Sequence, residues 1–476
     1  MRTTPVAQGA IVAVLVATWA TPAQQSDITL KIIGDRGRLR IAVPYLRGSE
    51  VSPEVTEVFN STLWNDLESS GVFEMVPKSL YPSQTPQRPE DFKPPLPPPP
   101  APLPRQPAGK KAKPDPEPIR QGPWLTDWSH PPVLANVLAF GFTAAKEARL
   151  LLSGWLYDPG KPDVSTAHVF GKRYSSSLDV QGARTLAHEF STDILQNLGA
   201  GKGNAGSRIY FVSNRTGDGN KEIWVMDYDG NNQTPITQYR SLCLSPEVSP
   251  DGSLLIFTSF ARGNPGIFLH SLETNRRLTF YNQRASLNAT PGFSPDGKQI
   301  AFASSASGRA QIYVANLDGS DLRRITHSLA VEVEPKFNPR NPGLIAFVSG
   351  RAGPPQVYLM EGEGTNVRRL TPSGGGDAVN PAWSPDGQRL AFSWTKGYEP
   401  GHYNVFIQEV ATGGLTQLTF GAGRNEHPSW SPDGRRIVFA SNRSGGTQIW
   451  TMLADGTQPR RLTTQGRNEQ PVWGVR

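Results

Sequence analysis

Short runs of aliphatic, aromatic and β-branched residues recur through the second half of the chain, separated by polar turn residues. One set of such runs covers residues 254–258, 299–303, 344–348, 389–393 and 436–440. Each is followed by a second run, for example residues 311–315 or 448–452, and then by a basic and apolar segment such as residues 323–326, 368–371 or 460–463. Runs of this length, bounded by turn residues, predict β-strands.

A turn phrase stands before each run of the first set. Ser-Pro-Asp-Gly starts at positions 249, 294, 384 and 431, and a degraded form starts at position 338, so successive copies are 45, 44, 46 and 47 residues apart. Pro presets one backbone angle, Asp accepts hydrogen bonds from its own turn, and Gly tolerates positive φ. A period of this length is typical of a β-propeller with one four-stranded blade per repeat, its strands A to D running outward from the channel.

The repeats predict how the ring closes. The first unit, residues 208–237, has candidates for strands B, C and D but none for strand A. The chain ends with residues 469–473, which resemble the strand A of residues 427–430 and have no strand B after them. We therefore expect residues 205–476 to form a six-bladed propeller whose last strand completes the first blade, which leaves no open sheet edge.

The first half of the chain has a mixed pattern. Strands are predicted at residues 28–32, 39–46, 72–76, 135–142, 150–157 and 168–174. Apolar residues at helical spacing predict helices at residues 53–70 and 180–198. Residues 35–200 are thus expected to form an α+β domain, interrupted at residues 82–118 by a Pro-rich insert. The insert is either a solvated spacer, which we favour, or a ligand for a partner that binds polyproline.

The N-terminus has the features of an export signal. Arg2 is followed by an apolar stretch at residues 10–17 and by the small residues around Ala23, where cleavage is expected. Residues 1–23 are therefore predicted to be a signal peptide, with an uncleaved anchor as the alternative. The mature chain is expected in the periplasm, without a direct membrane span and as a monomer.

Charge and cysteine content narrow the classes of partner. The net charge of +7 is modest for 476 residues, and the basic residues are scattered, which argues against nucleic acid binding. Cys243 is the one cysteine, so neither an internal disulfide framework nor a multi-cysteine metal site can form.

Motifs for catalysis are missing or incomplete. No Gly-x-Ser-x-Gly occurs on a strand-turn-helix, and Thr192 stands where a zinc-protease helix starting at His188 needs its second histidine. The repeated Asp of the Pro-Asp-Gly phrases is explained by turn geometry. We therefore expect a protein that is not an enzyme and has no catalytic residues, metal or cofactor. An exported propeller enzyme or a carbohydrate-binding sensor remains the alternative.

The candidate site is a ring of polar residues on one face of the propeller, where the loops from strand D to strand A and from B to C both lie. The loops from B to C supply one basic residue per blade, namely Arg215, Arg262, Arg309, Arg351, Lys396 and Arg443. The loops from D to A supply Asn288, Glu332, Glu334, Asn380, Asn425, Glu426, His427, Asn468 and Glu469. Such a charged rim suits capture of a protein or peptide, although any one of these residues could simply be a solvated turn residue.

Particular phrases at the domain junctions add a family resemblance. Residues 67–73, residues 77–80, residues 207–213 and residues 226–233, in this order and together with the Trp-Ser-Pro-Asp-Gly repeats, resemble the TolB family of the periplasmic Tol-Pal system. The resemblance covers nearly the whole mature chain. The Pro-rich insert departs from the family pattern.

The resemblance implies a non-enzymatic adaptor that supports outer-membrane integrity and constriction during cell division. It implies that the lipoprotein Pal binds the rim described above, with Asn288, Ala289 and residues 332–334 the best-matched positions, and that other envelope proteins could also bind. It further implies that residues 24–34 form an arm that binds TolA. Ile28, Leu30 and Ile32 alternate with polar residues in this arm, which fits binding by strand addition.

Overall fold

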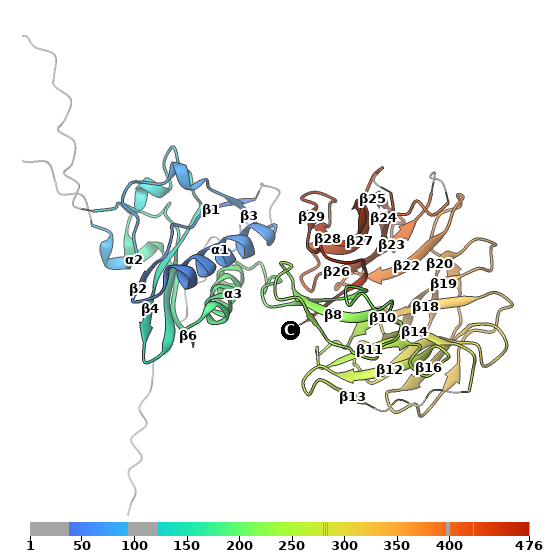
Figure 1. Ribbon diagram of the computed structural model, residues 1–476. Coiled ribbons are helices and arrows are strands. Elements are labelled where there is room, and N and C mark those ends of the chain that lie inside the picture. Colours follow the sequence, from blue (N-terminus) through green and yellow to red (C-terminus); the bar gives the residue numbers. More distant parts are fainter. Residues whose placement is uncertain are drawn as a thin grey trace, which may run out of the picture.

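The computed structural model of the chain describes residues 38–93, 122–278, 280, 282, 284–396, 400–421 and 423–475. The predicted signal peptide, the arm with Ile28, Leu30 and Ile32, and residues 94–121 of the insert lie outside this range. Within it, an N-terminal sheet with two long helices stands beside a ring of six four-stranded sheets (Figure 1).

The N-terminal sheet has the order β3-β1-β4-β5-β6, and β2 pairs with β4 beyond the end of β1. Its strands are β1 (Leu39–Ala42), β2 (Arg47–Ser49), β3 (Phe73–Met75), β4 (Val137–Lys146), β5 (Arg149–Tyr157) and β6 (His168–Ser177). The helices are α1 (Pro53–Ser69), α2 (Val164–Ala167) and α3 (Val180–Asn197), with 3-10 turns η2 (Lys78–Leu80), η3 (Pro89–Asp91) and η4 (Leu125–Trp128).

Local chemistry sets where the two long helices begin. The Ser52 hydroxyl accepts a hydrogen bond from the Val55 N–H at 3.3 Å, and Pro53 occupies the first turn of α1. The Asp179 carboxylate accepts from the Gly182 N–H at 2.6 Å and caps α3. Both helices bury their apolar stripes against one face of the sheet, around Phe59, Phe190 and their neighbours.

Two predictions for this half are corrected. The strand expected at residues 39–46 ends at Ala42, because the chain turns away from the sheet and the Leu46 N–H donates to the Asn60 side chain at 2.8 Å. The solvated spacer predicted from residue 82 begins later, because Phe92 is buried and packs edge-on against Phe140, with ring centroids 5.5 Å apart. The packed part of the domain therefore extends to Lys93.

The propeller contains all six predicted blades. From strand A to strand D they are β10 (Cys243–Val248), β11 (Leu254–Ser259), β12 (Gly266–Ser271) and β13 (Arg276–Leu278); β14 (Asn288–Phe293), β15 (Gln299–Ser304), β16 (Gln311–Asn316) and β17 (Arg323–Arg324); β18 (Glu332–Phe337), β19 (Leu344–Ser349), β20 (Gln356–Glu361) and β21 (Arg368–Arg369); β22 (Ala378–Trp383), β23 (Arg389–Trp394), β24 (Asn404–Glu409) and β25 (Leu415–Gln417); and β26 (Asn425–Trp430), β27 (Arg436–Ser444), β28 (Gly446–Leu453) and β29 (Arg460–Arg461).

The remaining blade joins the two ends of the ring. It consists of β30 (Asn468–Gly474), β7 (Arg208–Ser213), β8 (Glu222–Asp227) and β9 (Thr234–Pro235). β30 pairs antiparallel with β7, with Asn468 opposite Ser213 and Gly474 opposite Arg208. The predicted closure of the ring by the C-terminal strand is thus confirmed.

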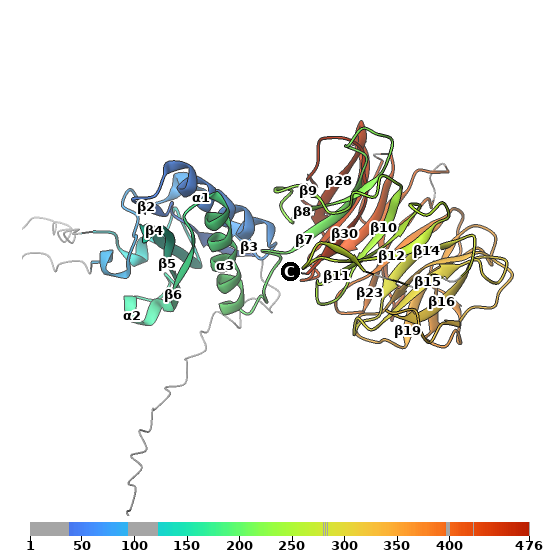
Figure 2. The ribbon, with the colours of Figure 1, turned by 60° about the horizontal axis from the view of Figure 1, so that its bottom comes forward.

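The blades pack through a repeated core. The fourth residue of each strand B is a phenylalanine, and all six are fully buried: Phe211, Phe257, Phe302, Phe347, Phe392 and Phe439. Apolar side chains of adjacent blades form shared clusters, so each blade buries one face against its neighbour. Figure 2 shows the blades arranged side by side around the ring.

Candidate functional site

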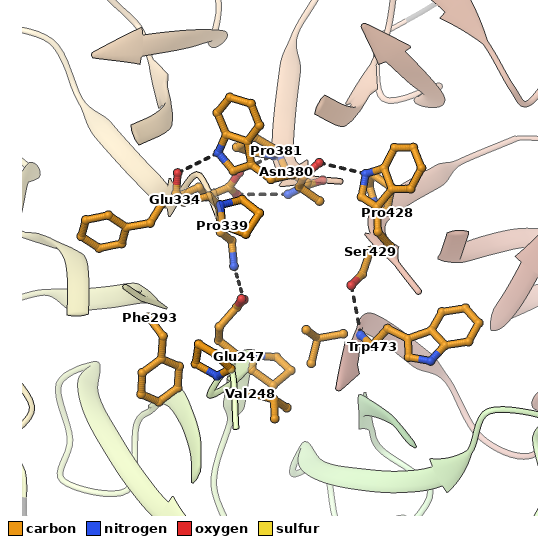
Figure 3. A pocket seen from close by; sticks show the side chains of 18 of the residues that line it. Glu247, Val248, Phe293, Glu334, Pro339, Asn380, Pro381, Pro428, Ser429 and Trp473 are labelled. Carbon is orange, nitrogen blue, oxygen red and sulfur yellow. Dashed lines mark hydrogen bonds and ion pairs between the residues drawn. The ribbon is translucent and has the colours of Figure 1, made fainter. Parts of the chain in front are cut away.

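A cavity of about 550 Å³ lies on the propeller axis and is lined by the strands A of all six blades. Prolines, Phe293 and three tryptophans supply much of its wall, and Figure 3 shows these side chains around the opening. The Trp383 indole donates to the carbonyl of Lys336 at 3.0 Å, and the Trp430 indole donates to the carbonyl of Ala382 at 3.1 Å. These bonds tie neighbouring blades together at the wall of the channel.

The third residue of every strand A has a left-handed backbone and precedes a proline. These residues are Ser245, Thr290, Glu334, Asn380, His427 and Gln470, with φ between 50° and 55°. A break in the pairing register falls at this point in every strand A, as in a β-bulge. Six strained residues therefore ring the channel, and strain of this kind clusters at functional sites.

Side chains of neighbouring strands satisfy the N–H groups that the bulges leave unpaired. The Ser245 N–H donates to the Gln470 side chain at 2.7 Å, and the Asn380 N–H donates to the Glu334 carboxylate at 2.6 Å. The Glu334 N–H in turn donates to the Thr290 hydroxyl at 3.1 Å. These bonds link β10 to β30, and they link β18 to both β14 and β22.

Charged groups lie within the channel and at its edge. Lys336 of β18 forms an ion pair with Glu247 of β10, although strand β14 lies between these two strands. The intervening residue is Gly292, where a Cβ would lie 2.7 Å from the Pro335 carbonyl oxygen. Burial lowers the pKa of His427, although the carboxylates of Glu426, Glu334 and Glu469 act in the opposite direction.

The predicted acidic and amide positions lie in strands A, not in the loops before them. Those at the first position of a strand are buried, with at most 3% of the residue exposed: Asn288, Glu332, Asn425 and Asn468. Ala289, Glu426 and Glu469 take the second position and are half-buried. The structure thus brings Glu334, Asn380 and His427 together at the channel and withdraws the first-position residues into the blades.

The predicted basic residues lie against their own blades. The Arg215 guanidinium lies 4.5 Å from the centre of the Trp224 ring and donates to Asn468 at 3.1 Å. Arg443 lies 5.1 Å from the Trp450 ring and donates to Asn425 at 2.8 Å. The cation therefore links the loop from B to C to the start of strand A.

The remaining basic positions follow the same arrangement. Arg351 pairs with Glu332 and lies over Tyr358; Arg262 lies over Phe268, Lys396 lies over Trp394, and Arg309 donates to the carbonyl of Leu329 at 2.5 Å. These cations therefore interact mainly with residues of the propeller itself.

The apolar residues of this face were not predicted from the sequence. Leu329, Val331 and Phe420 are 86%, 53% and 67% exposed, and they lie in loops from strand D to strand A. Large exposed apolar side chains concentrated on one face mark interaction sites in soluble proteins. No repeat or motif in the sequence predicts these residues, because the exposure of a loop side chain depends on how the blades fold.

A buried polar network joins the N-terminal domain to the opposite face of the propeller. The Asp66 carboxylate accepts hydrogen bonds from the Tyr228 hydroxyl and, at 2.8 Å, from the Ser191 hydroxyl. His188 Nδ1 lies 2.8 Å from the same carboxylate. Burial lowers the pKa of His188, but the charge and the hydrogen bond of Asp66, together with the charge of Asp229, outweigh burial, and the net shift of this pKa is upward.

Two arginines also form contacts between the N-terminal domain and the propeller. Arg184 of α3 pairs with Asp227 at 3.1 Å and with Asp229 at 2.8 Å. Arg436 donates to the carbonyl of Ser69 at 3.0 Å, and burial lowers its pKa to about 10. The two domains therefore contact through charged groups that are withdrawn from water. Ser69, Asp227, Tyr228 and Asp229 fall within the junction phrases singled out in the sequence.

Among the described residues, no helix is long and apolar enough to cross a membrane. In the same part of the chain, His, Cys, Asp and Glu side chains form no group of three or more that could hold a metal ion.

Comparison with known proteins identifies the family of this chain. The family model described as the TolB beta propeller domain matches residues 195–379 and 374–476. The chain belongs to this TolB propeller family. "Protein TolB homolog" of Chlorobium luteolum is 36% identical over 207 residues, which are 43% of this chain and 44% of that protein.

A further relative agrees with this assignment. "Tol-Pal system protein TolB" of Bordetella pertussis is 40% identical over 159 residues, 33% of this chain and 36% of the relative. The alignments thus span less than half the length of these curated relatives. The crystal structure of TolB from Acinetobacter baumannii superposes with a TM-score of 0.71 at 23% identity, covering 93% of this chain and 98% of that one, and shows the same fold.

Proposed function

We propose that this protein is a non-enzymatic periplasmic adaptor of the Tol-Pal system. It binds the lipoprotein Pal on the propeller face that carries the loops from strand D to strand A and from B to C, here called the loop face, and it binds TolA through residues 24–34. Membership of the TolB family and the names of the Tol-Pal relatives support this role. The observation that carries it is the closed ring with exposed apolar side chains on the face away from the N-terminal domain.

The composition of that face suits a protein partner. Leu329 and Phe420 supply apolar contact area, and Glu426 and Glu469, which pair with Arg424 and Lys221, supply charge on the same face. Apolar anchors surrounded by polar groups are the usual anatomy of a protein interface. In this proposal Glu334, Asn380 and His427 line the mouth that the partner covers, and the buried first-position residues hold the strands in place.

The arm gives the adaptor its second partner. An alternating segment such as residues 28–32 can add to the edge of a partner sheet. Binding of Pal would shift the balance between a docked and a released arm, which couples the two sites through differential affinity. The same adaptor would support outer-membrane integrity and constriction of the envelope at division.

The Pal surface can be tested with exposed apolar residues. Leu329→Asp and Phe420→Asp are each expected to weaken binding of purified Pal at least about tenfold in calorimetry, since they place charge in the interface core. The matched control is Leu322→Asp, an exposed leucine in the turn between β16 and β17 on the opposite face. Equal affinity of all three variants for Pal would show that Pal does not bind this face.

The arm is tested by deletion. Removal of residues 24–34 is expected to abolish TolA binding and to leave Pal affinity unchanged, because the arm lies outside the propeller. Loss of both TolA binding and Pal binding would indicate misfolding. Retained TolA binding would refute the proposal that the arm binds TolA. A pulldown from envelope extract should recover a lipoprotein, whereas turnover of a substrate panel would favour an enzyme.

A further inference from the structure

One face of the N-terminal sheet is covered over only part of its length. α1 and α3 cover the other face and, in both views, α3 lies between the sheet and the propeller (Figures 1 and 2). On the face away from them, Leu138, Phe140 and Tyr157 are buried under the loops that carry Phe92 and Trp128. Further along β4 and β5, the same face is left partly open at four half-buried residues, Phe142, Ala144, Leu151 and Ser153.

Arginines surround this open part. The pairing register sets Arg47 of β2, Phe142 of β4, Ser153 of β5 and Arg173 of β6 in one row on the same face. Arg88 joins them, with its guanidinium 4.6 Å from the centre of the Phe142 ring. All three arginines are exposed.

These cations lack acidic partners. Across the described residues, no carboxylate lies within ion-pair distance of Arg47, Arg88 or Arg173. The carboxylate of Asp91 is close in sequence but accepts from the backbone N–H groups of Gln87 and Arg88, at 2.7 and 2.9 Å. Unpaired guanidinium groups over an aromatic floor favour an anionic ligand, since each can bind a carboxylate in a bidentate manner.

The edge of the sheet beside this row is also open. β6 is ten residues long and, in the part of the chain that the structure describes, pairs with β5 alone. An unpaired edge strand presents N–H and C=O groups to any incoming strand. Lys172 and Arg173 lie at its middle, and a second copy of β6 in antiparallel register would bring these like charges together, which disfavours a dimer through this edge.

We propose that β6 and the arginines Arg47, Arg88 and Arg173 form a docking site for an extended acidic segment of a partner protein, which adds to the sheet as a further strand. The free backbone groups of β6 select a polypeptide over other polyanions, because only a strand can pair with them. The arginine row selects acidic side chains. The site is distinct from the propeller face.

The Pro-rich insert of this chain is the competing occupant. The described chain stops at Lys93 and resumes at Gly122, next to the buried Phe92. Residues 94–121 include Arg105, Lys110, Lys111, Lys113 and Arg120 but only Asp115 and Glu117 as acidic residues. Charge therefore disfavours the insert on a surface of unpaired arginines, and prolines cannot donate to an edge strand.

The test uses the mature full chain and a fluorescent synthetic peptide that alternates glutamate and valine. Binding is followed by anisotropy at low salt, and hydrogen exchange reports on the amides of residues 168–177. We expect saturable binding with slower exchange in β6. Arg47→Glu and Arg173→Glu should each lower the affinity about five- to tenfold, because each replaces an attraction by a repulsion.

Matched controls separate the two parts of the site. Arg276→Glu changes an exposed arginine of β13 on the propeller and should leave the affinity unchanged. A peptide N-methylated at alternate residues keeps its charge but cannot pair as a strand, and it should bind at least tenfold more weakly. Equal binding of the methylated peptide, or no saturation at millimolar peptide, overturns the proposal. Binding that appears only after deletion of residues 94–121 would assign the surface to the insert instead.

Discussion

Single residues set the shape of the blades through backbone conformation. In the turn between strands A and B of the second repeat, Ser294 accepts from the Gln299 N–H at 2.9 Å and donates to Asp296 at 2.6 Å, and Gly297 has φ of 70°. The sequence predicted this turn because each residue type has a separate physical reason to be there. The strained residues of strands A were not predicted, although the recurring X-Pro pairs could have signalled them.

Gly297→Ala is expected to cost about 1 kcal/mol of unfolding free energy, because an L-residue at this positive φ is strained. A Cβ at this position would meet only Pro250 Cδ at 3.7 Å, so sterics add little. Gly375→Ala is the matched control, since its φ lies outside the left-handed region and nothing lies within 4 Å. Urea unfolding of both variants measures the difference, and equal stability would contradict the role of φ.

At the level of elements, the pairing of β30 with β7 holds the ring closed. β30 also packs against strands β26, β27 and β10 of the adjacent blades. Its loss would expose β7 as an open edge and uncover the apolar clusters on both sides. The sequence predicted this element from counting alone, because a repeat that lacks strand A and a terminus that supplies one must be complementary in a closed ring.

A chain that ends at Gly466 is therefore expected to unfold at a temperature at least about 10 °C lower, and to have a larger radius in solution, than the full chain. Calorimetry and small-angle scattering check this. A synthetic peptide of residues 467–475 added in trans should restore part of the loss, whereas a scrambled peptide should not. A truncated chain as compact and as heat-resistant as the full one would contradict closure.

On the scale of the whole molecule, the junction between the domains depends on charges withdrawn from water. Asp66 is 4% exposed and holds groups from α3 and from the propeller at once. Removing one partner from such a network leaves the others buried without compensation. This arrangement keeps the N-terminal domain against the face of the propeller opposite to the loop face.

Asp66→Asn is expected to cost about 3 kcal/mol and to loosen the domain contact, because His188 and Tyr228 lose a charged acceptor. Unfolding followed by tryptophan fluorescence and limited proteolysis near residues 199–206 measure the two effects. Glu68→Gln changes an exposed carboxylate on the same helix and should shift stability by less than about 0.5 kcal/mol. Comparable losses in both variants would count against the network.

His188 makes the junction sensitive to pH. Its pKa is raised in the folded protein, so its pairing with Asp66 stabilises fully below its ordinary value and less as pH rises through the folded value. The stability advantage of the wild type over His188→Gln should therefore be largest below about pH 6 and should decline as the pH rises above that value. Urea unfolding at several pH values tests this, and a constant difference would refute it.

Local sequence determined the parts of this protein that depend on short-range physics. The period of the turn phrase, the alternation of apolar residues and the helix-capping residues are local, so blade count, ring closure and the two long helices could be predicted. The sequence also suggested a rim of charges, but only the tertiary structure decided which of those charges are available. Arg215 and Arg443 meet aromatic rings of their own blades, and Asn425 and Asn468 enter the core, because neighbouring blades bring those partners within reach. The network around Asp66 and the arginine row beside β6 join segments that lie far apart in the chain, and contacts of that kind leave no periodic signal in the sequence. The exposure of the leucine and the phenylalanine of the loop face likewise depends on the folded blades.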